Sequence, residues 1–372
     1  MAELITSLEI HGFRSLSAVE VPALGKVNLV TGKNNAGKTS VLEAIRILAS
    51  GGARQTLIDV LSYRDALSLS PDSDALRTAV ELSPFRNLFT GFPDVSTGDV
   101  GFSISSTGSL TTPSISAKIA WFTRKVDDDG SFAGYEAASI DMFADGEVLP
   151  AFAIDVGSGR RRVIPLDRLL RRNARIRDPE PLSPCVFLDP FSSRSTSQMG
   201  TLWDTIALTD VEAEVVSALQ IVSPDIEAVS VVGGDDRTTG RVAIARSAMY
   251  DAPVPLRTFG DGVNRLFSII LSLCNARNGI LLVDEIENGL HFTAQTELWR
   301  TIFRLARVLN VQVFATTHSW DCVKAFQRAA EEDIDQKGAL VRLTRRRGGK
   351  IVVTTFSEEE LAIVTRDDIE VR

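Results

Sequence analysis

The chain has 372 residues, of which 44% are hydrophobic and 24% charged, a composition typical of a soluble globular protein with ample material for a core. The formal net charge of -8 argues against a protein that coats nucleic acid with its whole surface, although one basic face stays open. No apolar run is long enough to span a bilayer, the N-terminus has no signal-peptide region, and three separated cysteines lack metal-ligand spacing. We therefore expect a cytoplasmic protein without a membrane partner.

The first 31 residues predict two or three strands: Leu4–Ile10, Ala18–Val21 and Val27–Thr31. Between the first two strands lies the run Gly-Phe-Arg-Ser, which contains Arg14. Taken alone, Arg14 would be a solvated loop charge. His11 has no role that the sequence assigns.

A phosphate-binding loop follows the third strand. Gly32 to Thr39 reads Gly-Lys-Asn-Asn-Ala-Gly-Lys-Thr and matches the P-loop pattern G-x-x-x-x-G-K-[ST] at every position. The two glycines leave room for backbone N–H groups to face a phosphate, Lys38 would reach the β/γ oxygens, and the Thr39 hydroxyl would bind Mg²⁺. Apolar residues at helical spacing then predict a helix from Thr39 to Ala49, whose N-terminus faces the phosphates. We expect the nucleotide to contact Gly32, Lys33, Asn34, Asn35, Ala36, Gly37, Lys38, Thr39 and Ser40.

From residue 52 to residue 182 the sequence predicts an inserted β-rich lobe. Leu57–Leu61 favours a helix, and alternating runs separated by turn residues predict the strands Arg77–Leu82, Gly101–Ser105, Ser114–Phe122 and Ile140–Phe143. The lobe ends in a basic run, Arg160–Arg177, part of which, Arg162–Arg175, can form a helix. This run is either a solvated face or a surface that contacts the phosphates of DNA.

The second half of the site begins after residue 183. Val186–Leu188 predicts a strand, Val211–Ile221 a helix, and Ala228–Val232 and Arg241–Ala245 a pair of strands. Four apolar residues, Ile280–Val283, then run into Asp284 and Glu285, which predicts a buried strand with two acids at its carboxyl end, where open α/β sheets bind ligands. Asp284 would hold Mg²⁺ through water, and Glu285 would act as the general base on the attacking water.

Two more segments flank this strand. Thr258 to Arg265 contains Gly260, Asp261 and Gly262 and opens a helix that runs to about Ala276, and Val311–Thr317 predicts a strand that ends before His318. The order of P-loop, glycine-rich helix start, Asp-Glu strand and strand-His resembles that of ABC-type ATPases. The Gly-Phe-Arg-Ser run before the P-loop resembles the SMC/RecF branch of that class.

The resemblance implies further roles. Arg14 would lie near the nucleotide, His318 would be the switch histidine that contacts the γ-phosphate, and Gly260–Gly262 would be the signature motif that closes on the nucleotide of a second chain. The signature departs from the transporter pattern L-S-G-G-Q, because Gly260 replaces the serine and Val263 the glutamine. Backbone N–H groups, Asn264 or Arg265 could serve instead, and Asp261 could cap the helix. The Q-loop residue is open between Gln55 and Gln198.

The segment Asp-Glu-Ile-Glu-Asn-Gly-Leu-His resembles the ATPase module of proteins of the overcoming-lysogenization-defect (OLD) type, which are RecF-like. Its last four residues, Asn288, Gly289, Leu290 and His291, match the D-loop, which crosses the dimer interface in that class. OLD-type nucleases continue into a Toprim module, whereas this sequence ends in two predicted strands, Ala339–Thr344 and Lys350–Thr355, and a short helix from Ser357. No Toprim acids are found, so we expect that this chain alone does not cut DNA. The turn Arg345–Arg347 is either solvated or a nucleic-acid contact.

The sequence thus predicts an α/β fold: a P-loop NTPase of the ABC ATPase-head type, with a mixed sheet flanked by helices, formed by residues 1–51 and 183–372. We expect an ATPase with ATP and Mg²⁺ as ligands, an ATP-dependent homodimer, and a separate nuclease or other effector as partner, in DNA repair or bacteriophage defence. Two alternatives remain: a non-hydrolytic ATP-sensing interaction module, and the ATP-binding subunit of a transporter.

Overall fold

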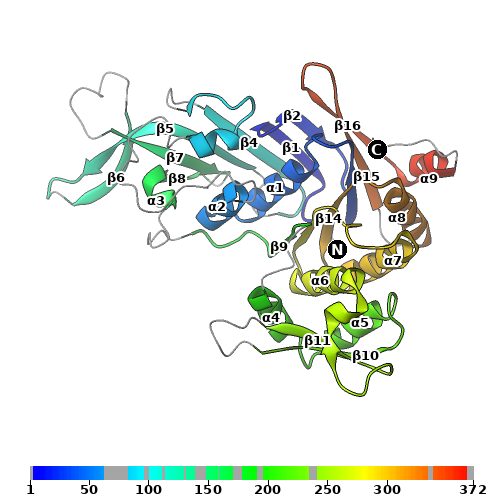
Figure 1. Cartoon of the computed structure of the whole chain (residues 1–372). Coiled ribbons are helices and arrows are strands. Elements are labelled where there is room, and N and C mark those ends of the chain that lie inside the picture. Colours follow the sequence, from blue (N-terminus) through cyan, green and yellow to red (C-terminus); the bar gives the residue numbers. More distant parts are fainter. Residues whose placement is uncertain are drawn as a thin grey trace.

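The structure is a computed structural model. It describes residues 3–62, 83–95, 100–110, 114–129, 131–138, 148–157, 159–170, 178–190, 196–233, 241–333 and 338–366. Two larger sheets and one small sheet are arranged around helices (Figure 1). Within these ranges, every helix is too short or too polar to cross a membrane.

A six-stranded sheet forms the centre of the fold. The candidate site described below lies at the carboxyl ends of its parallel strands. The strand order is β16-β15-β3-β14-β13-β9, and only the β15–β16 pair is antiparallel. Strands β3, β13 and β14 are buried along their whole length, as expected for parallel strands covered on both faces. The strands are β3 (Val27–Thr31), β9 (Cys185–Leu188), β13 (Ile280–Val283), β14 (Gln312–Thr317), β15 (Gly338–Arg345) and β16 (Ile351–Phe356).

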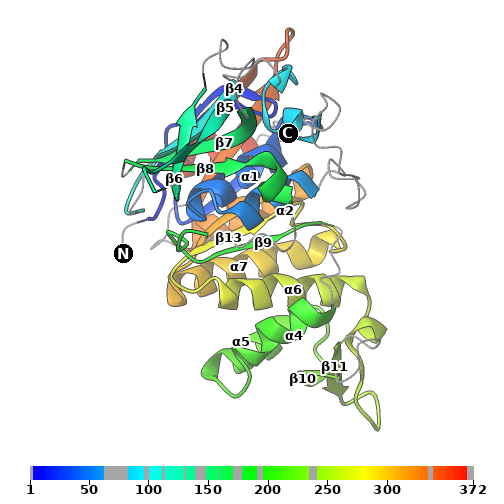
Figure 2. The same ribbon diagram turned by 90° about the vertical axis from the view of Figure 1, so that its left-hand side faces the viewer.

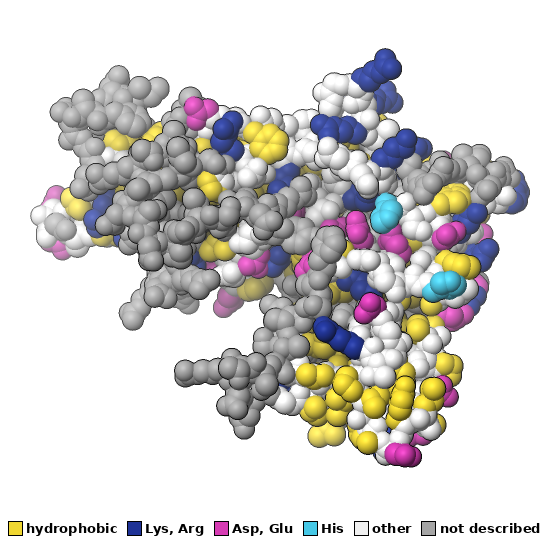
Figure 3. Space-filling view, in the orientation of Figure 1, with side chains coloured by type: hydrophobic (Ala, Val, Ile, Leu, Met, Phe, Trp, Pro, Cys, Tyr) yellow, Lys and Arg dark blue, Asp and Glu magenta, His cyan; other side chains and the backbone are white. Residues whose placement is uncertain are grey.

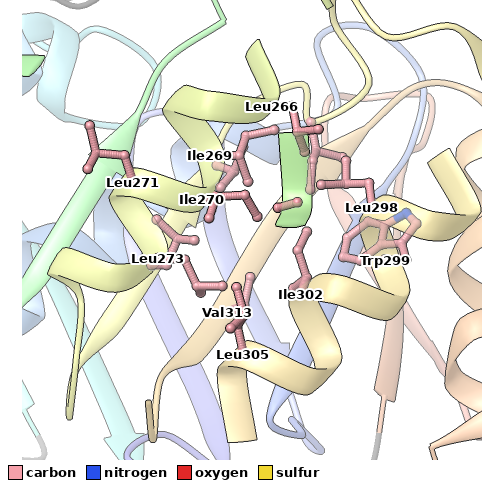
Figure 4. Packing of buried hydrophobic residues seen from close by; sticks show 14 of the residues in the cluster. Leu266, Ile269, Ile270, Leu271, Leu273, Leu298, Trp299, Ile302, Leu305 and Val313 are labelled. Atoms are coloured by element: carbon pink, nitrogen blue, oxygen red, sulfur yellow. The ribbon is translucent and has the colours of Figure 1, made fainter. Parts of the chain in front are cut away.

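Three long helices cover one face of this sheet: α6 (Asp261–Asn275), α7 (Phe292–Val308) and α8 (Trp320–Glu332). Leu266 and Ile270 of α6 and Ile302 of α7 pack against strand residues such as Val313 (Figure 4). Alternate residues of each strand belong to this core, because successive side chains of a strand point to opposite faces.

The other face packs on α1 (Lys38–Ala49), the helix that follows the P-loop. Beyond α1 lies a seven-stranded antiparallel sheet of order β2-β1-β4-β5-β7-β8, with β6 paired to β5 (Figure 2). Its strands are β1 (Ser7–Phe13), β2 (Leu16–Val21), β4 (Val100–Thr107), β5 (Ser114–Val126), β6 (Phe132–Ala137), β7 (Val148–Val156) and β8 (Arg160–Pro165). One hydrophobic cluster includes residues of β1, α1, β4 and β7, so α1 lies between the two sheets in a shared core.

The predicted inserted segment is joined to the N-terminal strands by backbone pairing. Strand β4 pairs antiparallel with β1 from Ser7↔Thr107 to His11↔Ser103. The β-rich character of the segment is as predicted for Gly101–Ser105 and Ser114–Phe122, whereas Arg77–Leu82 and Ile140–Phe143 lie outside the described residues. The division of the chain into a head and an inserted lobe stays a prediction.

The prediction of a helix from Arg162 is wrong for its first turn. Residues Arg160–Pro165 form β8 and pair antiparallel with β7, and the helix α3 begins only at Leu166. Pro165 explains the difference, because a proline disfavours helical backbone in the residue before it, and the β-branched Val163 and Ile164 suit a strand.

The remaining elements lie around the two sheets. The small sheet has the order β10-β11-β12 and lies beyond α6, together with α4 and α5 (Figure 1). The elements are α2 (Arg54–Ser62), η1 (Ser83–Leu88), α3 (Leu166–Leu170), α4 (Thr196–Asp204), α5 (Asp210–Leu219), β10 (Ile226–Val232), β11 (Val242–Ser247), β12 (Val254–Pro255), η4 (Leu256–Phe259) and α9 (Glu358–Arg366).

Candidate nucleotide site

The P-loop connects β3 to α1 and is held open by glycine backbone. Gly32 has φ 148° and Gly37 has φ 92°, values that glycine adopts without strain. A Cβ on Gly32 would lie 2.4 Å from the Leu343 carbonyl oxygen of β15, and one on Gly37 would lie 2.8 Å from the Leu16 side chain. Gly32 is therefore required by backbone packing as well as by the loop conformation, whereas at Gly37 the requirement comes mainly from the loop conformation, because the Leu16 side chain can shift.

Lys38 is the first residue of α1, and its ammonium group lies over the loop. Its Nζ donates to the Gly32 carbonyl at 2.7 Å and approaches the Lys33 carbonyl at 3.4 Å. Burial lowers the pKa of Lys38, and the nearby carboxylates of Asp284, Glu285 and Glu287 act in the opposite direction. Lys33, Asn34 and Asn35 are exposed on the outside of the loop, whereas Ala36 and Ser40 are buried.

The two predicted magnesium ligands lie side by side. Parallel strands β3 and β13 both end at the same edge of the sheet, separated by β14. There the Thr39 hydroxyl donates to Asp284 Oδ2 at 2.9 Å, and Asp284 is almost fully buried. Hydroxyl and carboxylate oxygens are the hard donors that Mg²⁺ takes in P-loop sites, so these residues fit the ion.

A third residue, Thr316 of β14, completes this arrangement. Its hydroxyl donates to Asp284 Oδ1 at 2.5 Å and accepts from the Glu285 backbone N–H at 2.8 Å. The Ile286 N–H then donates to the Thr316 carbonyl at 3.0 Å. The loop after β13 is thus bonded to the end of β14, and Glu285 is held with φ 47°, in the left-handed region. Such a conformation is uncommon outside glycine and needs support from the surroundings.

His318 follows β14 and faces two glutamates. Its Nδ1 lies 3.2 Å from Glu287 Oε1 and 3.9 Å from Glu285 Oε1, and its backbone N–H donates to Glu287 Oε1 at 3.0 Å. The strand order thus brings the predicted base and the predicted switch histidine together at the edge that holds Lys38 and Asp284.

The signature residues lie at the start of α6, beside the D-loop of the same chain. Gly260 precedes the helix with φ 97°, and a Cβ added there would meet no atom within 4 Å. A Cβ on Gly262 would lie 3.0 Å from the Gly289 carbonyl oxygen, so the two segments are in close contact. No side-chain hydrogen bond caps α6, although Asp261 stands in its first turn.

The rest of the predicted D-loop leads into α7. The Asn288 side chain donates to the Pro190 carbonyl at 2.9 Å, and Leu290 packs at the edge of the core. His291 is exposed at the N-cap position of α7, where its Nδ1 lies 2.8 Å from the Thr293 hydroxyl. A contact of these residues with a second chain stays a prediction.

The described contacts of Arg265 are all made within its own chain; a contact with a partner's nucleotide was one of several options that the sequence left open. Its guanidinium donates to the carbonyls of Asp189 at 2.9 Å, Asp284 at 2.8 Å and Glu285 at 3.1 Å. Only 9% of the residue is exposed, and burial lowers the pKa of Arg265. The group therefore ties the signature helix to the loop that carries the predicted base.

Arg14 is buried against α1. Its Nε lies 2.6 Å from Glu43 Oε2, and its Nη2 donates to the Val60 carbonyl of α2 at 2.8 Å. Glu43 stands one turn after Thr39 on the P-loop helix. Contact of Arg14 with the nucleotide stays a prediction; the described contacts link the loop after β1 to α1 and α2.

The first basic run is partly engaged within the chain. Arg162 is half-buried and donates to the carbonyls of Gly51 at 3.0 Å and Gly52 at 2.7 Å, so its guanidinium holds the connection between α1 and α2. The sequence left this run open between a solvated face and a surface that contacts DNA phosphates, and the internal contacts of Arg162 fit neither alternative. Residues 171–177 lie outside the described part of the chain. By contrast, Arg345, Arg346 and Arg347 are exposed on the β15–β16 hairpin, where Lys and Arg side chains gather at the tip (Figure 3).

The two candidates for the Q-loop lie on different helices, α2 and α4. Gln55 is exposed on α2 and donates to Asp59 at 2.8 Å. Gln198 is in α4, and its side chain lies outside the described part.

Sequence reasoning missed three residues of the site: Thr316, Glu287 and Glu43. Thr316 and Glu287 both lie inside segments that the motifs mark: Thr316 stands two positions before His318, and Glu287 two positions after Glu285. The signal that could have indicated these two residues is a polar side chain close to a motif at the end of a strand. Glu43 gave no signal, since a glutamate inside an amphipathic helix is normally solvated.

Known proteins resemble this chain over most of its length. The family model described as "AAA domain, putative AbiEii toxin, Type IV TA system" matches residues 27–321, more than half of the chain. A Helicobacter pylori (strain ATCC 700392 / 26695) protein named "ATP/GTP phosphatase" is 22% identical over 353 residues, which cover 88% of this chain and 89% of that protein. "DNA replication and repair protein RecF" of Thioalkalivibrio sulfidiphilus (strain HL-EbGR7) is 35% identical over 79 residues, 21% of this chain and 20% of that protein.

Among solved structures, the "SmcHead bound to the C-winged helix domain of ScpA" matches with a TM-score of 0.50 at 15% identity, covering 96% of this chain and 99% of that chain. At this identity the likeness shows the fold alone, and the predicted ABC ATPase-head fold is confirmed. The chain therefore belongs to the family of AAA domains described above, and it is an ATPase of the RecF/SMC/ABC class.

Proposed function

We propose that this ATPase is Mg²⁺-dependent, that it dimerises head to head on ATP, and that the dimer regulates a separate effector. The observation that carries the proposal is the cluster at the carboxyl edge of the central sheet. There, Lys38 lies on the P-loop, Asp284 accepts from Thr39, and Glu285 and His318 face each other.

Each residue of this cluster has a separate role in the proposed hydrolysis. The P-loop amides and Lys38 bind the phosphates and stabilise the charge that develops during transfer. Thr39 and Asp284 would hold Mg²⁺, which supplies positive charge beside the phosphate oxygens when bound. Glu285, whose side chain is 35% exposed, can accept the proton of the attacking water. His318 adds a polar contact at the γ-phosphate.

The start of α6 supports the proposed dimer. An N-terminus of a 15-residue helix attracts anions, and the added Cβ on Gly260 meets no atom within 4 Å. A phosphate held by the P-loop of a second chain could approach this end closely. Arg265 would then connect the two composite sites, because it bonds the helix that serves one site to the loop that serves the other.

Steady-state hydrolysis of ATP, with and without EDTA, tests the proposal. We expect turnover that EDTA abolishes. Glu285→Gln should retain ATP binding, lose about 100-fold or more in kcat because the general base is gone, and accumulate as a dimer in light scattering. Glu297→Gln, an exposed glutamate on α7, is the matched control and should behave as the wild type.

Three outcomes would change the proposal. Normal turnover of Glu285→Gln would show that another group is the base. Stable ATP binding by the wild type with negligible turnover would favour a non-hydrolytic ATP-sensing module. Co-purification with a membrane protein would favour a transporter subunit.

The effector and its setting rest on resemblance. The family description names a toxin–antitoxin system, and several short matches are RecF proteins, which supports a place in DNA repair or in defence against bacteriophage. The finer likeness to OLD-type ATPases suggests a nuclease as the effector. Cytoplasmic location stays part of the proposal.

DNA contact is proposed for the β15–β16 hairpin. Three consecutive arginines at its turn are exposed, and cations released from DNA by such contacts make binding depend on salt. Replacing Arg345, Arg346 and Arg347 by Ser should weaken DNA binding and reduce the slope of log K against log salt by about 3 for duplex DNA. An unchanged slope would exclude this hairpin as the contact.

A further inference from the structure

Glu287 is a buried glutamate beside the predicted base, and nothing in the resemblance gives it a role. It stands two residues after the proposed base, and only 9% of it is exposed. Its Oε1 accepts from the His318 backbone N–H at 3.0 Å and lies 3.2 Å from His318 Nδ1. Its Oε2 is buried and has no hydrogen-bond partner among the described residues. The described hydrogen bonds of this carboxylate are therefore all made to His318.

The pair of contacts fixes the histidine in two ways. The bond to the backbone N–H holds the loop after β14, and the contact to Nδ1 sets the direction of the ring. A carboxylate beside Nδ1 requires the proton on that nitrogen, which leaves Nε2 as the nitrogen available to other groups. The His318 side chain is 53% exposed, so without such a partner its ring would be free to adopt other rotamers.

The two glutamates beside His318 are not equivalent. Glu285 reaches Nδ1 only at 3.9 Å, and its side chain is 35% exposed, so it can meet water. Glu287 is enclosed. Burial lowers the pKa of Lys38 and of Arg265, and the negative charge of Glu287 is one of several nearby charges that oppose both shifts. Burial of an anion is costly unless it makes specific contacts, which favours a defined structural task for Glu287.

We propose that Glu287 is a positioning residue of the hydrolysis site: it holds His318, through backbone and ring, in the orientation that contacts the γ-phosphate. This inference rests on the proposed function of His318. Glu287 itself touches neither substrate nor metal ion. It acts on turnover through the histidine, and Glu285 remains the base.

A double-mutant cycle tests this in the full-length protein. We expect Glu287→Ala to lower kcat by about 10- to 100-fold, because a misplaced group near the reacting atoms costs that much, with KM for ATP changed less than about threefold. Glu287→Gln keeps an acceptor oxygen and should stay within about threefold of the wild-type kcat. In a His318→Ala background, Glu287→Ala should cause no further loss, since two residues that act as one unit are not additive. Glu297→Ala is the surface control.

Nitrogen-15 NMR of the histidine rings gives a readout without hydrolysis. The chain has three histidines, and the signals of His318 are those lost in His318→Ala. Glu287→Gln should shift the ring signals of His318 and leave those of His11 and His291 in place. If Glu287→Ala fails to fold, this measurement on Glu287→Gln still tests whether Glu287 holds the ring of His318.

Unshifted ring signals, or additive losses in the cycle, would overturn the inference. A fall in kcat for Glu287→Ala that persists undiminished without His318 would mean that Glu287 acts directly. If the wild type does not hydrolyse ATP at all, the proposed function fails, whereas the NMR shift still tests the contact between Glu287 and His318.

Discussion

The two glycine-rich segments of the site, the P-loop and the start of α6, differ in what surrounds them. Around the P-loop, the chain itself fills the space: the Leu343 carbonyl oxygen stands 2.4 Å from a Cβ on Gly32. At the start of α6, a Cβ on Gly260 would meet nothing within 4 Å. The P-loop is complete within one chain, whereas the signature end presents a polar helix terminus to open space. Packing alone thus distinguishes the enclosed P-loop from the open start of α6, which is the end that we propose a second chain approaches.

The largest effect is expected for Gly32→Ala. The added methyl group clashes with backbone, and φ 148° is strained for alanine, so we expect a loss of about 3 kcal/mol or more in the free energy of unfolding. Urea denaturation measures it. A loss below about 0.5 kcal/mol, the range of an ordinary surface substitution, would contradict the view that the P-loop is enclosed.

Lys38→Ala tests the positive charge beside the enclosed P-loop. The loss of a charged donor to phosphate is expected to weaken ATP binding by about 10- to 100-fold, without unfolding the protein. Lys125→Ala, at an exposed lysine of β5 away from the loop, is the control and should change affinity less than about threefold. Equilibrium titration with a fluorescent ATP analogue distinguishes them, and equal losses would speak against a specific role for Lys38.

Thr316→Val removes one hydroxyl group from the end of β14, beside the P-loop, and leaves the volume of the side chain nearly unchanged. Asp284 loses a donor and the Glu285 N–H loses its acceptor, so we expect a cost of about 1–3 kcal/mol in stability and a reduced kcat. Thr301→Val, at a buried threonine of α7, controls for the loss of a hydroxyl away from the site. If both variants keep full turnover, Thr316 does not hold the loop of Glu285.

A smaller effect on folding than that of Gly32→Ala is expected for Gly260→Ala. The added methyl group meets open space, so only the backbone strain at φ 97° and ψ 165° remains, about 1–3 kcal/mol. We expect a folded monomer that binds ATP normally and dimerises more weakly on ATP. Analytical ultracentrifugation with Glu285→Gln as the background measures this. Unimpaired dimerisation would show that a second chain does not approach Gly260 closely.

The sequence was sufficient for the parts of the fold that depend on local pattern. The strands that precede the P-loop, Asp284 and His318 are short apolar runs beside fixed motifs, and each motif stands at the end of its strand as predicted. The helix at Asp210–Leu219 and the hairpin of β15 and β16 also follow their periodicity.

The contacts between distant residues could not be predicted. The partner of Arg14 is a glutamate inside α1, and the partners of Arg162 are two backbone carbonyls near residue 51. No pattern marks a carbonyl as an acceptor for a distant arginine. Likewise, the guanidinium of Arg265 reaches its own chain because α6 packs beside β13, which only the tertiary structure decides.

The pairing of β4 with β1 has a thermodynamic consequence. Strands from the inserted segment and the P-loop helix share one hydrophobic core, so any rearrangement of the outer sheet changes the packing of α1. A molecule that binds these strands more tightly in one nucleotide state must alter ATP affinity by the same factor, because binding linkage is reciprocal. Isothermal titration of ATP with and without such a ligand would yield the coupling free energy directly. An effector could thus be identified by its influence on nucleotide affinity before any of its own activity is known.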